Sequence, residues 1–238
     1  MTRRDLLAAS VGAGCSRAAA APPRQPNFIF VYTDDQRYDC LGSVQREQGE
    51  AGRFPWLETP NMDRLAAEGV RFRNAFVVHS LCTPSRASFL TGQYTHRHGI
   101  FTNFIPFPDH MVNFGAELTA AGYATAYIGK WHMGDQGGRR PGFTYSASYT
   151  GQGQYFDCPF QINGAPAETR GWVDDVATDY AIEFIKAHRS ARFAMVVGFK
   201  SPHNPFLPPP RLRRKFEGVG NDLTLELTIN RWKAWYLS

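Results

Sequence analysis

Apolar residues along the chain occur either in short unbroken runs or with helical spacing. The short runs are rich in β-branched and aromatic residues and predict strands at residues 28–32, 70–78, 123–128 and 193–199. Because residues 28–32 are apolar without interruption, we expect this strand to be fully buried. Residues 137–171 show no period, which predicts a long loop or a small hairpin excursion.

Segments with helical periodicity or helix-end signals separate these strands. They span residues 59–69, 82–92, 113–121 and 173–188. The first begins with a capping threonine followed by proline and ends at a glycine. Strands that alternate with helices predict an α/β fold, in which ligands bind beyond the carboxyl ends of the strands.

Polar side chains with catalytic or ligand chemistry follow every predicted strand. They are Asp34, Asp35, Cys82, Arg86, Lys130, His132 and His203. The adjacent carboxylates repel each other unless a cation or water lies between them, so they indicate either a metal site or a loop in water. The lysine and the histidine, taken alone, would be surface residues by default.

The composition is that of a soluble globular domain. The 238 residues are 43% hydrophobic and 14% aromatic, which favours a folded chain over a disordered one. The formal net charge is +5, and the one basic run, residues 211–215, has no interleaved aromatic residues. We therefore expect no nucleic-acid partner; this run indicates a solvated face or, as the second reading, attraction of a polyanionic substrate.

The amino terminus has the pattern of a twin-arginine export signal. Arg3 and Arg4 precede a short apolar run, and small residues occupy positions 18–21. We expect residues 1–21 to be removed on export to the periplasm or the medium; the alternative is a ragged basic terminus. No apolar run is long enough for a stable membrane span.

Three cysteines remain after residue 21. They are Cys40, Cys82 and Cys158, and an odd number cannot form a complete disulfide framework. Cys40 and Cys158 are most simply packing residues, although an oxidising compartment would allow a bridge between them. Either way, Cys82 is left unpaired.

The segment at residues 82–92 reads Cys-Thr-Pro-Ser-Arg-Ala-Ser-Phe-Leu-Thr-Gly. Pro84 suits a first helical turn, whose free N–H groups favour an anion, and Arg86 lies one turn on. The segment resembles the sulfatase signature Cys-x-Pro-Ser-Arg-x-x-x-Leu-Thr-Gly at every fixed position. Residues 33–42 and 122–132 resemble two further sulfatase motifs, and His203 lies in a Pro-His-x-Pro loop of the family type.

This resemblance covers about residues 27–216. It implies the alkaline-phosphatase-like fold, a mixed and mostly parallel sheet sandwiched by helices. It also implies that a formylglycine-generating enzyme oxidises Cys82 to formylglycine, whose hydrated form attacks the sulfur of a sulfated small molecule or polysaccharide. Asp34 and Asp35, together with the modified Cys82, would hold Ca²⁺.

The remaining roles also come from the resemblance. Arg86 and His132 would orient and deprotonate the hydrated formylglycine, and Lys130 would bind sulfate. His203 would bind sulfate or protonate the leaving oxygen. The same superfamily includes phosphonate and phosphate diester hydrolases, which is the alternative activity.

The sequence departs from the family after residue 217. The second metal pair, Asp-Asn or Asp-His, a further lysine and the carboxy-terminal subdomain have no counterpart, and Asn221-Asp222 has the reverse order. We therefore expect residues 22–217 to be the amino-terminal part of a sulfatase domain, and residues 218–238 to be an unassigned tail from a truncated or shifted reading frame. A non-catalytic fragment, binding sulfated glycans or nothing, is the third alternative.

Overall fold

The structure is a computed structural model and describes residues 25–215. Within them, the chain forms a six-stranded sheet in the order β1-β6-β2-β3-β4-β5. The strands are β1 (Phe28–Tyr32), β2 (Ala124–Lys130), β3 (Tyr145–Tyr149), β4 (Phe160–Ile162), β5 (Ala165–Ala167) and β6 (Phe193–Gly198). The first four in the sheet order are parallel, and β4 and β5 pair antiparallel. This confirms the predicted mixed and mostly parallel sheet.

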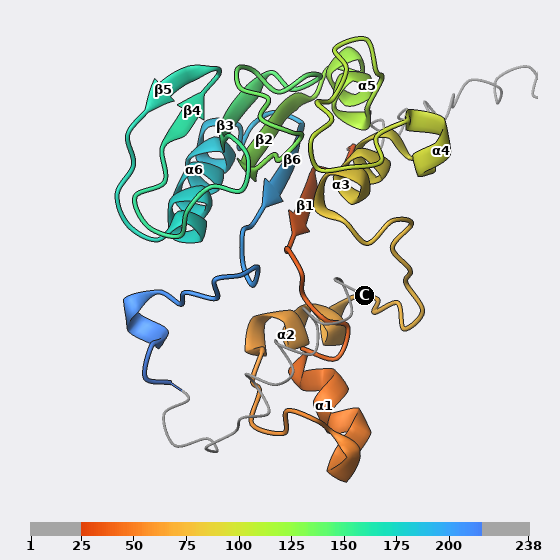
Figure 1. Ribbon diagram of the computed structural model, residues 1–238, viewed down its shortest axis with the longest axis vertical. Coiled ribbons are helices and arrows are strands. Elements are labelled where there is room, and N and C mark those ends of the chain that lie inside the picture. The colour runs from red at the N-terminus through yellow and green to blue at the C-terminus, as the bar shows by residue number, and fades with distance from the viewer. Residues whose placement is uncertain (1–24, 216–238) are drawn as a thin grey trace, which may run out of the picture.

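Helices cover both faces of the sheet (Figure 1). They are α1 (Gly42–Gln48), α2 (Pro60–Glu68), α3 (Cys82–Thr91), α4 (Thr95–His98), α5 (Phe114–Ala120) and α6 (Val173–Ala187), with short 3₁₀ helices at Gly49–Ala51 and Pro210–Leu212. The long α6 lies on one face, α3 and α5 lie on the other, and α1 and α2 lie beyond the sheet (Figure 1). None of the helices within residues 25–215 is long and apolar enough to cross a membrane.

The central strands contribute side chains to two separate hydrophobic cores, one on each face of the sheet. In β2, Ala126 and Ile128 pack in the core that contains the apolar stripe of α6, whereas Tyr127 packs in the core that contains Leu90 of α3. Successive side chains of a strand point to opposite faces of a sheet, so these strands are buried from both sides. A run of apolar residues without alternation is therefore what the interior of this sheet requires.

The predicted strand at residues 28–32 is present with the predicted bounds, but it is not fully buried. Ile29 is 50% exposed and Val31 is 60% exposed. The helix α6 packs mainly over β2, β6 and β3, while β1 lies at one end of the strand order. One face of β1 therefore has no covering element among the described residues, and the prediction of complete burial is wrong.

The predicted strand at residues 70–78 is absent. Residues 69–81 are irregular, and Phe72 and Phe76 are 79% and 90% exposed. An alternating pattern becomes a strand only where a neighbour accepts its backbone hydrogen bonds. Within residues 25–215, this segment pairs with none of the six strands of the sheet.

Residues 137–171 contain the expected hairpin, formed by β4 and β5, and also a strand that the sequence did not indicate. This strand, β3, pairs in parallel with β2 along Tyr145–Tyr149. Its Tyr-Ser-Ala-Ser-Tyr sequence has no β-branched residue, but its buried Ser148 hydroxyl accepts a hydrogen bond from Arg140 Nε at 2.6 Å. Pairing with β2 and this polar contact stabilise a strand in which only the two tyrosines have high strand propensity.

The cysteines among the described residues are all free, so Cys40 and Cys158 do not pair here. Cys158 is 1% exposed and packs in the core beneath α6. The proposed export signal at residues 1–21 and the tail at residues 218–238 lie outside the described residues.

The strands β2 and β6 approach closely at a pair of glycines. Gly129 is opposite Gly198 in the parallel register and has a φ of +86°. A Cβ added at Gly129 would lie 2.1 Å from the Gly198 carbonyl oxygen, which is far inside contact distance. Lys130 is the next residue and the last of β2. The close approach of the two strands therefore fixes the position of the Lys130 side chain.

We expect Gly129→Ala to lower the free energy of unfolding by about 3 kcal/mol or more, because it combines a positive φ with a backbone clash. The matched control is Gly138→Ala, where φ is +82° but no atom lies within 4 Å of the added Cβ. The control should lose only about 1 kcal/mol. Urea unfolding followed by circular dichroism measures both, and equal losses would contradict the steric explanation.

Candidate functional site

The ends of β1, β2 and β6 and the first turn of α3 meet around a buried carboxylate. Beside it, a cavity of about 410 Å³ is lined by the loop after β1 and the start of α3, including Asp34, Asp35, Cys82 and Arg86. Ligands of parallel sheets bind at this edge because the carboxyl ends of neighbouring strands converge there. The structure therefore brings together side chains that are far apart in the sequence.

Asp34 is at the centre of the cluster and is 5% exposed. Its Oδ2 lies 2.5 Å from Lys130 Nζ and 3.0 Å from an Arg86 guanidinium nitrogen. Burial by itself would raise the pKa of Asp34, but Arg86 and Lys130 outweigh it and lower the pKa to about 2. Asp34 is therefore ionised throughout the physiological pH range.

Arg86 joins α3 to the sheet as well as to Asp34. Its guanidinium also donates to the Lys130 carbonyl oxygen at 2.6 Å and to the Tyr127 hydroxyl at 3.2 Å. The side chain is 2% exposed, and its Nε has no hydrogen-bond partner among the described residues. A planar guanidinium with several fixed contacts cannot swing away, so its charge is preorganised.

Lys130 was expected just beyond its strand and is the last residue of β2. Its side chain is fully buried, and its ammonium donates to Gln152 Oε1 at 2.5 Å in addition to the Asp34 contact. His132, two residues later, was expected to point the same way if the chain stayed extended. The chain instead turns at His132, whose φ is +45°.

His132 is nevertheless buried within the same electrostatic environment. Burial, together with Lys130 and Arg86, lowers the pKa of His132 to about 3, so its imidazole is neutral. Its Nδ1 has no hydrogen-bond partner among the described residues. Its backbone oxygen accepts a hydrogen bond from Thr83 Oγ1 at 2.7 Å, which ties this segment to the first turn of α3.

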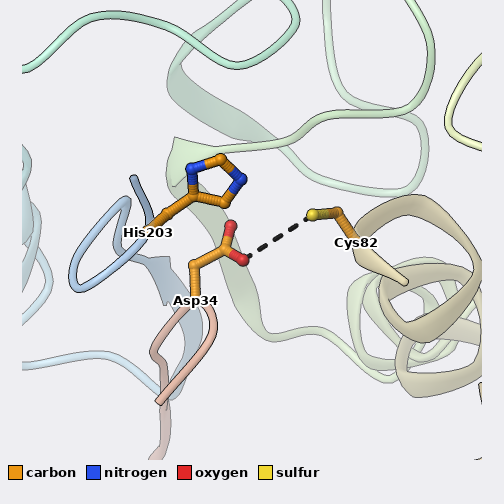
Figure 2. A group of neighbouring side chains, drawn as sticks. All are labelled: Asp34, Cys82 and His203. Carbon is orange, nitrogen blue, oxygen red and sulfur yellow. Dashed lines mark hydrogen bonds between the residues drawn. The ribbon is translucent and has the colours of Figure 1, made fainter. Parts of the chain in front are cut away.

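Cys82 is the first residue of α3, and its thiol points at Asp34 (Figure 2). Sγ lies 3.7 Å from Asp34 Oδ1. Burial, and then the Asp34 carboxylate, raise the pKa of the Cys82 thiol, so the side chain stays protonated. A protonated thiol is a poor nucleophile, and unmodified Cys82 is therefore a weak candidate for direct attack.

His203 completes the cluster from the loop after β6. In Figure 2 its ring lies just above the carboxylate of Asp34. Ligand atoms of Asp34, Cys82 and His203 all lie within 4.8 Å of one another. His203 Nε2 is also 3.7 Å from Asp35 Oδ2, and the Tyr155 hydroxyl donates to the His203 backbone oxygen.

Asp35 differs from Asp34 in exposure and in backbone geometry. Its side chain is 42% exposed and its φ is +60°. Burial and the neighbouring Asp34 carboxylate raise its pKa. The Asp34 carboxylate disfavours a second negative charge beside it, which makes ionisation of Asp35 harder.

Three residues of the site were not selected from the sequence. Lys200 lies two residues after the end of β6 and is 2% exposed. Gln152 contacts Lys130, and the Asp174 carboxylate accepts hydrogen bonds from the backbone N–H groups of residues 200 and 201. The rule that functional groups follow strands would have found Lys200. Gln152 and Asp174 carry no such signal, because one lies in an aperiodic loop and the other resembles an acidic residue of a helix first turn.

The donor set fits part of a Ca²⁺ site. Asp34 and Asp35 supply carboxylate oxygens, which Ca²⁺ prefers, and a cation between them would offset their mutual repulsion. The thiol of Cys82 is a soft donor and suits Ca²⁺ only after conversion to an oxygen-bearing group. The described residues therefore offer fewer hard ligands than the six to eight that Ca²⁺ usually takes.

Comparisons with known proteins agree with this geometry. The family model described as Sulfatase matches residues 26–227. The N-acetylglucosamine-6-O-sulfatase of Bacteroides thetaiotaomicron is 36% identical over 212 residues, which cover 86% of this chain and 36% of that protein. The ulvan-active sulfatase of Formosa agariphila is 33% identical over 204 residues, covering 79% of this chain and 38% of that protein.

A solved structure, BT4656 in complex with its substrate D-glucosamine-2-N,6-O-disulfate, superposes with a TM-score of 0.74 at 35% identity. The match covers 82% of this chain and 38% of that one. This chain thus spans well under half the length of the relatives described here. The family model matches most of the sequence, and the chain belongs to the sulfatase family.

Proposed function

We propose that the chain contributes the nucleophile and the sulfate-binding half of a site that hydrolyses sulfate esters. The observation that supports this most directly is the pair of buried cations, Arg86 and Lys130, around the single carboxylate of Asp34. Two positive charges against one negative charge leave an excess that an anionic ester would neutralise. A sulfate monoester repels nucleophiles, so fixed positive groups are needed for its cleavage.

The proposed nucleophile is a formylglycine made from Cys82 by a formylglycine-generating enzyme. Support comes from the intact Cys-x-Pro-Ser-Arg sequence, and from the raised pKa of the thiol, which disfavours direct attack by cysteine. A hydrated formylglycine supplies an oxygen nucleophile at this position and would be held between Asp34 and the N-terminus of α3.

The chain's own residues then take distinct parts. Asp34, Asp35 and the modified Cys82 would hold Ca²⁺, which neutralises charge on the ester oxygens when bound. His132 is neutral, and its Nδ1 has no hydrogen-bond partner among the described residues, so this nitrogen would be the proton acceptor. Arg86 would orient the hydrated formylglycine, Lys130 would bind the sulfate oxygens, and His203, from the loop after β6, would bind sulfate or donate a proton to the leaving oxygen.

The proposed substrates are sulfated carbohydrates. This rests on the relatives: one is an N-acetylglucosamine-6-O-sulfatase, another is an ulvan-active sulfatase, and the substrate of BT4656 is a glucosamine disulfate. The buried anion pocket would recognise only the sulfate group. Selectivity for the sugar and for the sulfated position would come from residues around the leaving group. Comparison of matched sulfate and phosphonate esters tests the sulfate preference.

We expect Cys82 to be converted when the chain is produced together with a formylglycine-generating enzyme, because the sequence element that is read before folding is complete. Mass spectrometry of the tryptic peptide that contains residue 82 measures the conversion. Cys158, which has no proline two residues later and no arginine four residues later, is the internal control. An unmodified thiol under conditions that convert a reference sulfatase would refute this part of the proposal.

The 238-residue chain by itself should show little or no aryl sulfatase turnover and poor stability, even with Cys82 converted. The described residues supply only part of a Ca²⁺ ligand set, and Ile29 and Val31 expose apolar surface on β1. Turnover of an aryl sulfate is measured with Ca²⁺ and with a chelator, beside the same chain fused to the carboxy-terminal half of a sulfatase. Robust Ca²⁺-dependent turnover by the unfused chain would show that it holds a complete ligand set.

We also propose export by the twin-arginine route, from the sequence of residues 1–21. Arg3→Lys together with Arg4→Lys should leave the precursor uncleaved in the cytoplasm. Immunoblots of cytoplasmic and periplasmic fractions measure this, with Arg17→Lys as the matched control of the same chemistry. Unchanged export of the double variant would indicate the general secretory route.

A further inference from the structure

The loop after β3 places one residue, Gln152, against two buried ammonium groups. Its side-chain Oε1 accepts a hydrogen bond from Lys130 Nζ at 2.5 Å. Its backbone oxygen accepts one from Lys200 Nζ at 2.9 Å. The two lysines come from the ends of β2 and β6, so a single loop residue joins the cations of two neighbouring strands.

We infer that Gln152 is a positioning residue that presets Lys130 and Lys200 as a paired ammonium site for the sulfate group. This inference rests on the proposed function and adds Lys200 to its anion-binding groups. It also gives the loop at residues 150–155 a second link to the site, in addition to the hydrogen bond from the Tyr155 hydroxyl to the His203 backbone oxygen.

Lys200 is built into the site and is not a surface lysine. The residue is 2% exposed, and its backbone N–H donates to Asp174 Oδ1 at 2.8 Å. Its ammonium lies 5.1 Å from the centroid of the Tyr155 ring. Within residues 25–215, no carboxylate lies within ion-pair distance of this ammonium, so its charge is held by a carbonyl oxygen and an aromatic face.

The chemistry of an amide explains why glutamine suits position 152. An amide oxygen accepts a hydrogen bond from Lys130 without adding negative charge, so the ammonium is oriented but not neutralised. Asp34 is the one carboxylate within ion-pair distance of Lys130 in the described part of the chain. The buried carboxylate of Asp174 is bound to backbone N–H groups. Lys130 shares the Asp34 carboxylate with Arg86, and Lys200 has no carboxylate within ion-pair distance among the described residues, so the cluster keeps a net positive charge for an anion.

The test uses the full 238-residue chain and compares Gln152→Glu and Gln152→Ala with Gln154→Glu. Gln154 is an exposed residue of the same loop whose side chain donates to the Asp157 backbone oxygen, so its variant changes the net charge equally without contacting either lysine. Three quantities are measured: the Kd for inorganic sulfate by calorimetry, the ε-methylene NMR signals of ¹³C-labelled lysines, and the Tm.

Gln152→Glu should raise the Kd for sulfate by about tenfold or more, because a carboxylate would neutralise Lys130. Gln152→Ala should raise it about fivefold and should shift the Lys130 signal, because a charge-assisted hydrogen bond is lost. Gln154→Glu should leave the Kd and both lysine signals unchanged. If Gln152 served only packing, its Glu and Ala variants would change the Tm, but their Kd values for sulfate would not differ from the Kd of Gln154→Glu.

Sulfate binding by Gln152→Glu that equals binding by Gln154→Glu would overturn the positioning role while leaving the proposed function intact. Lys130→Met separates the two questions. If the unaltered chain and Lys130→Met bind sulfate equally, or neither binds it, the proposed sulfate site is wrong. The NMR signals of the lysines then test the positioning role of Gln152 separately. If the Lys130 signal does not shift in Gln152→Ala, Gln152 does not position this ammonium.

Discussion

The carboxylate of Asp34 is the group on which the arrangement of the site depends. It is buried, and it binds Arg86 from α3 and Lys130 from β2 at 3.0 and 2.5 Å. Burying three ionic groups is unfavourable unless each has a partner, and removal of one partner typically costs about 3–5 kcal/mol. The three segments are therefore fixed relative to one another by charge, in addition to the apolar packing on the two faces of the sheet.

Backbone geometry supplies the second condition for this cluster. The glycine pair at residues 129 and 198 lets β2 and β6 approach directly beneath Lys130, and Gly198 also leaves room for the Arg86 guanidinium. The Arg86 contact with the Lys130 carbonyl oxygen depends on that approach. A larger residue at either position would move the strand end that carries the ammonium, so core packing and site geometry are not separable here.

The sequence predicted the parts of this structure that follow from local pattern. Residues before Asp34, Lys130 and His203 form parallel strands, and parallel strands bring their carboxyl ends to one edge, so the site could be assembled without coordinates. The failures have nonlocal causes. Val31 is exposed because α6 does not extend over β1. The strand at residues 145–149 forms because it pairs with β2. The contact of Gln152 with Lys130 comes from a loop whose sequence shows no periodic pattern.

The same charges explain why cation and anion binding should be linked at this edge. Asp34 Oδ2 is already shared by two cations, whereas Oδ1 faces Cys82 Sγ at 3.7 Å. A divalent cation held by Asp34 and Asp35 would add positive charge next to Arg86 and Lys130, which is unfavourable by Coulomb's law unless an anion enters with it. A sulfate ester alone would face the repulsion of the Asp34 and Asp35 carboxylates. With Ca²⁺ and a sulfate ester bound as proposed, each would reduce the electrostatic cost of binding the other.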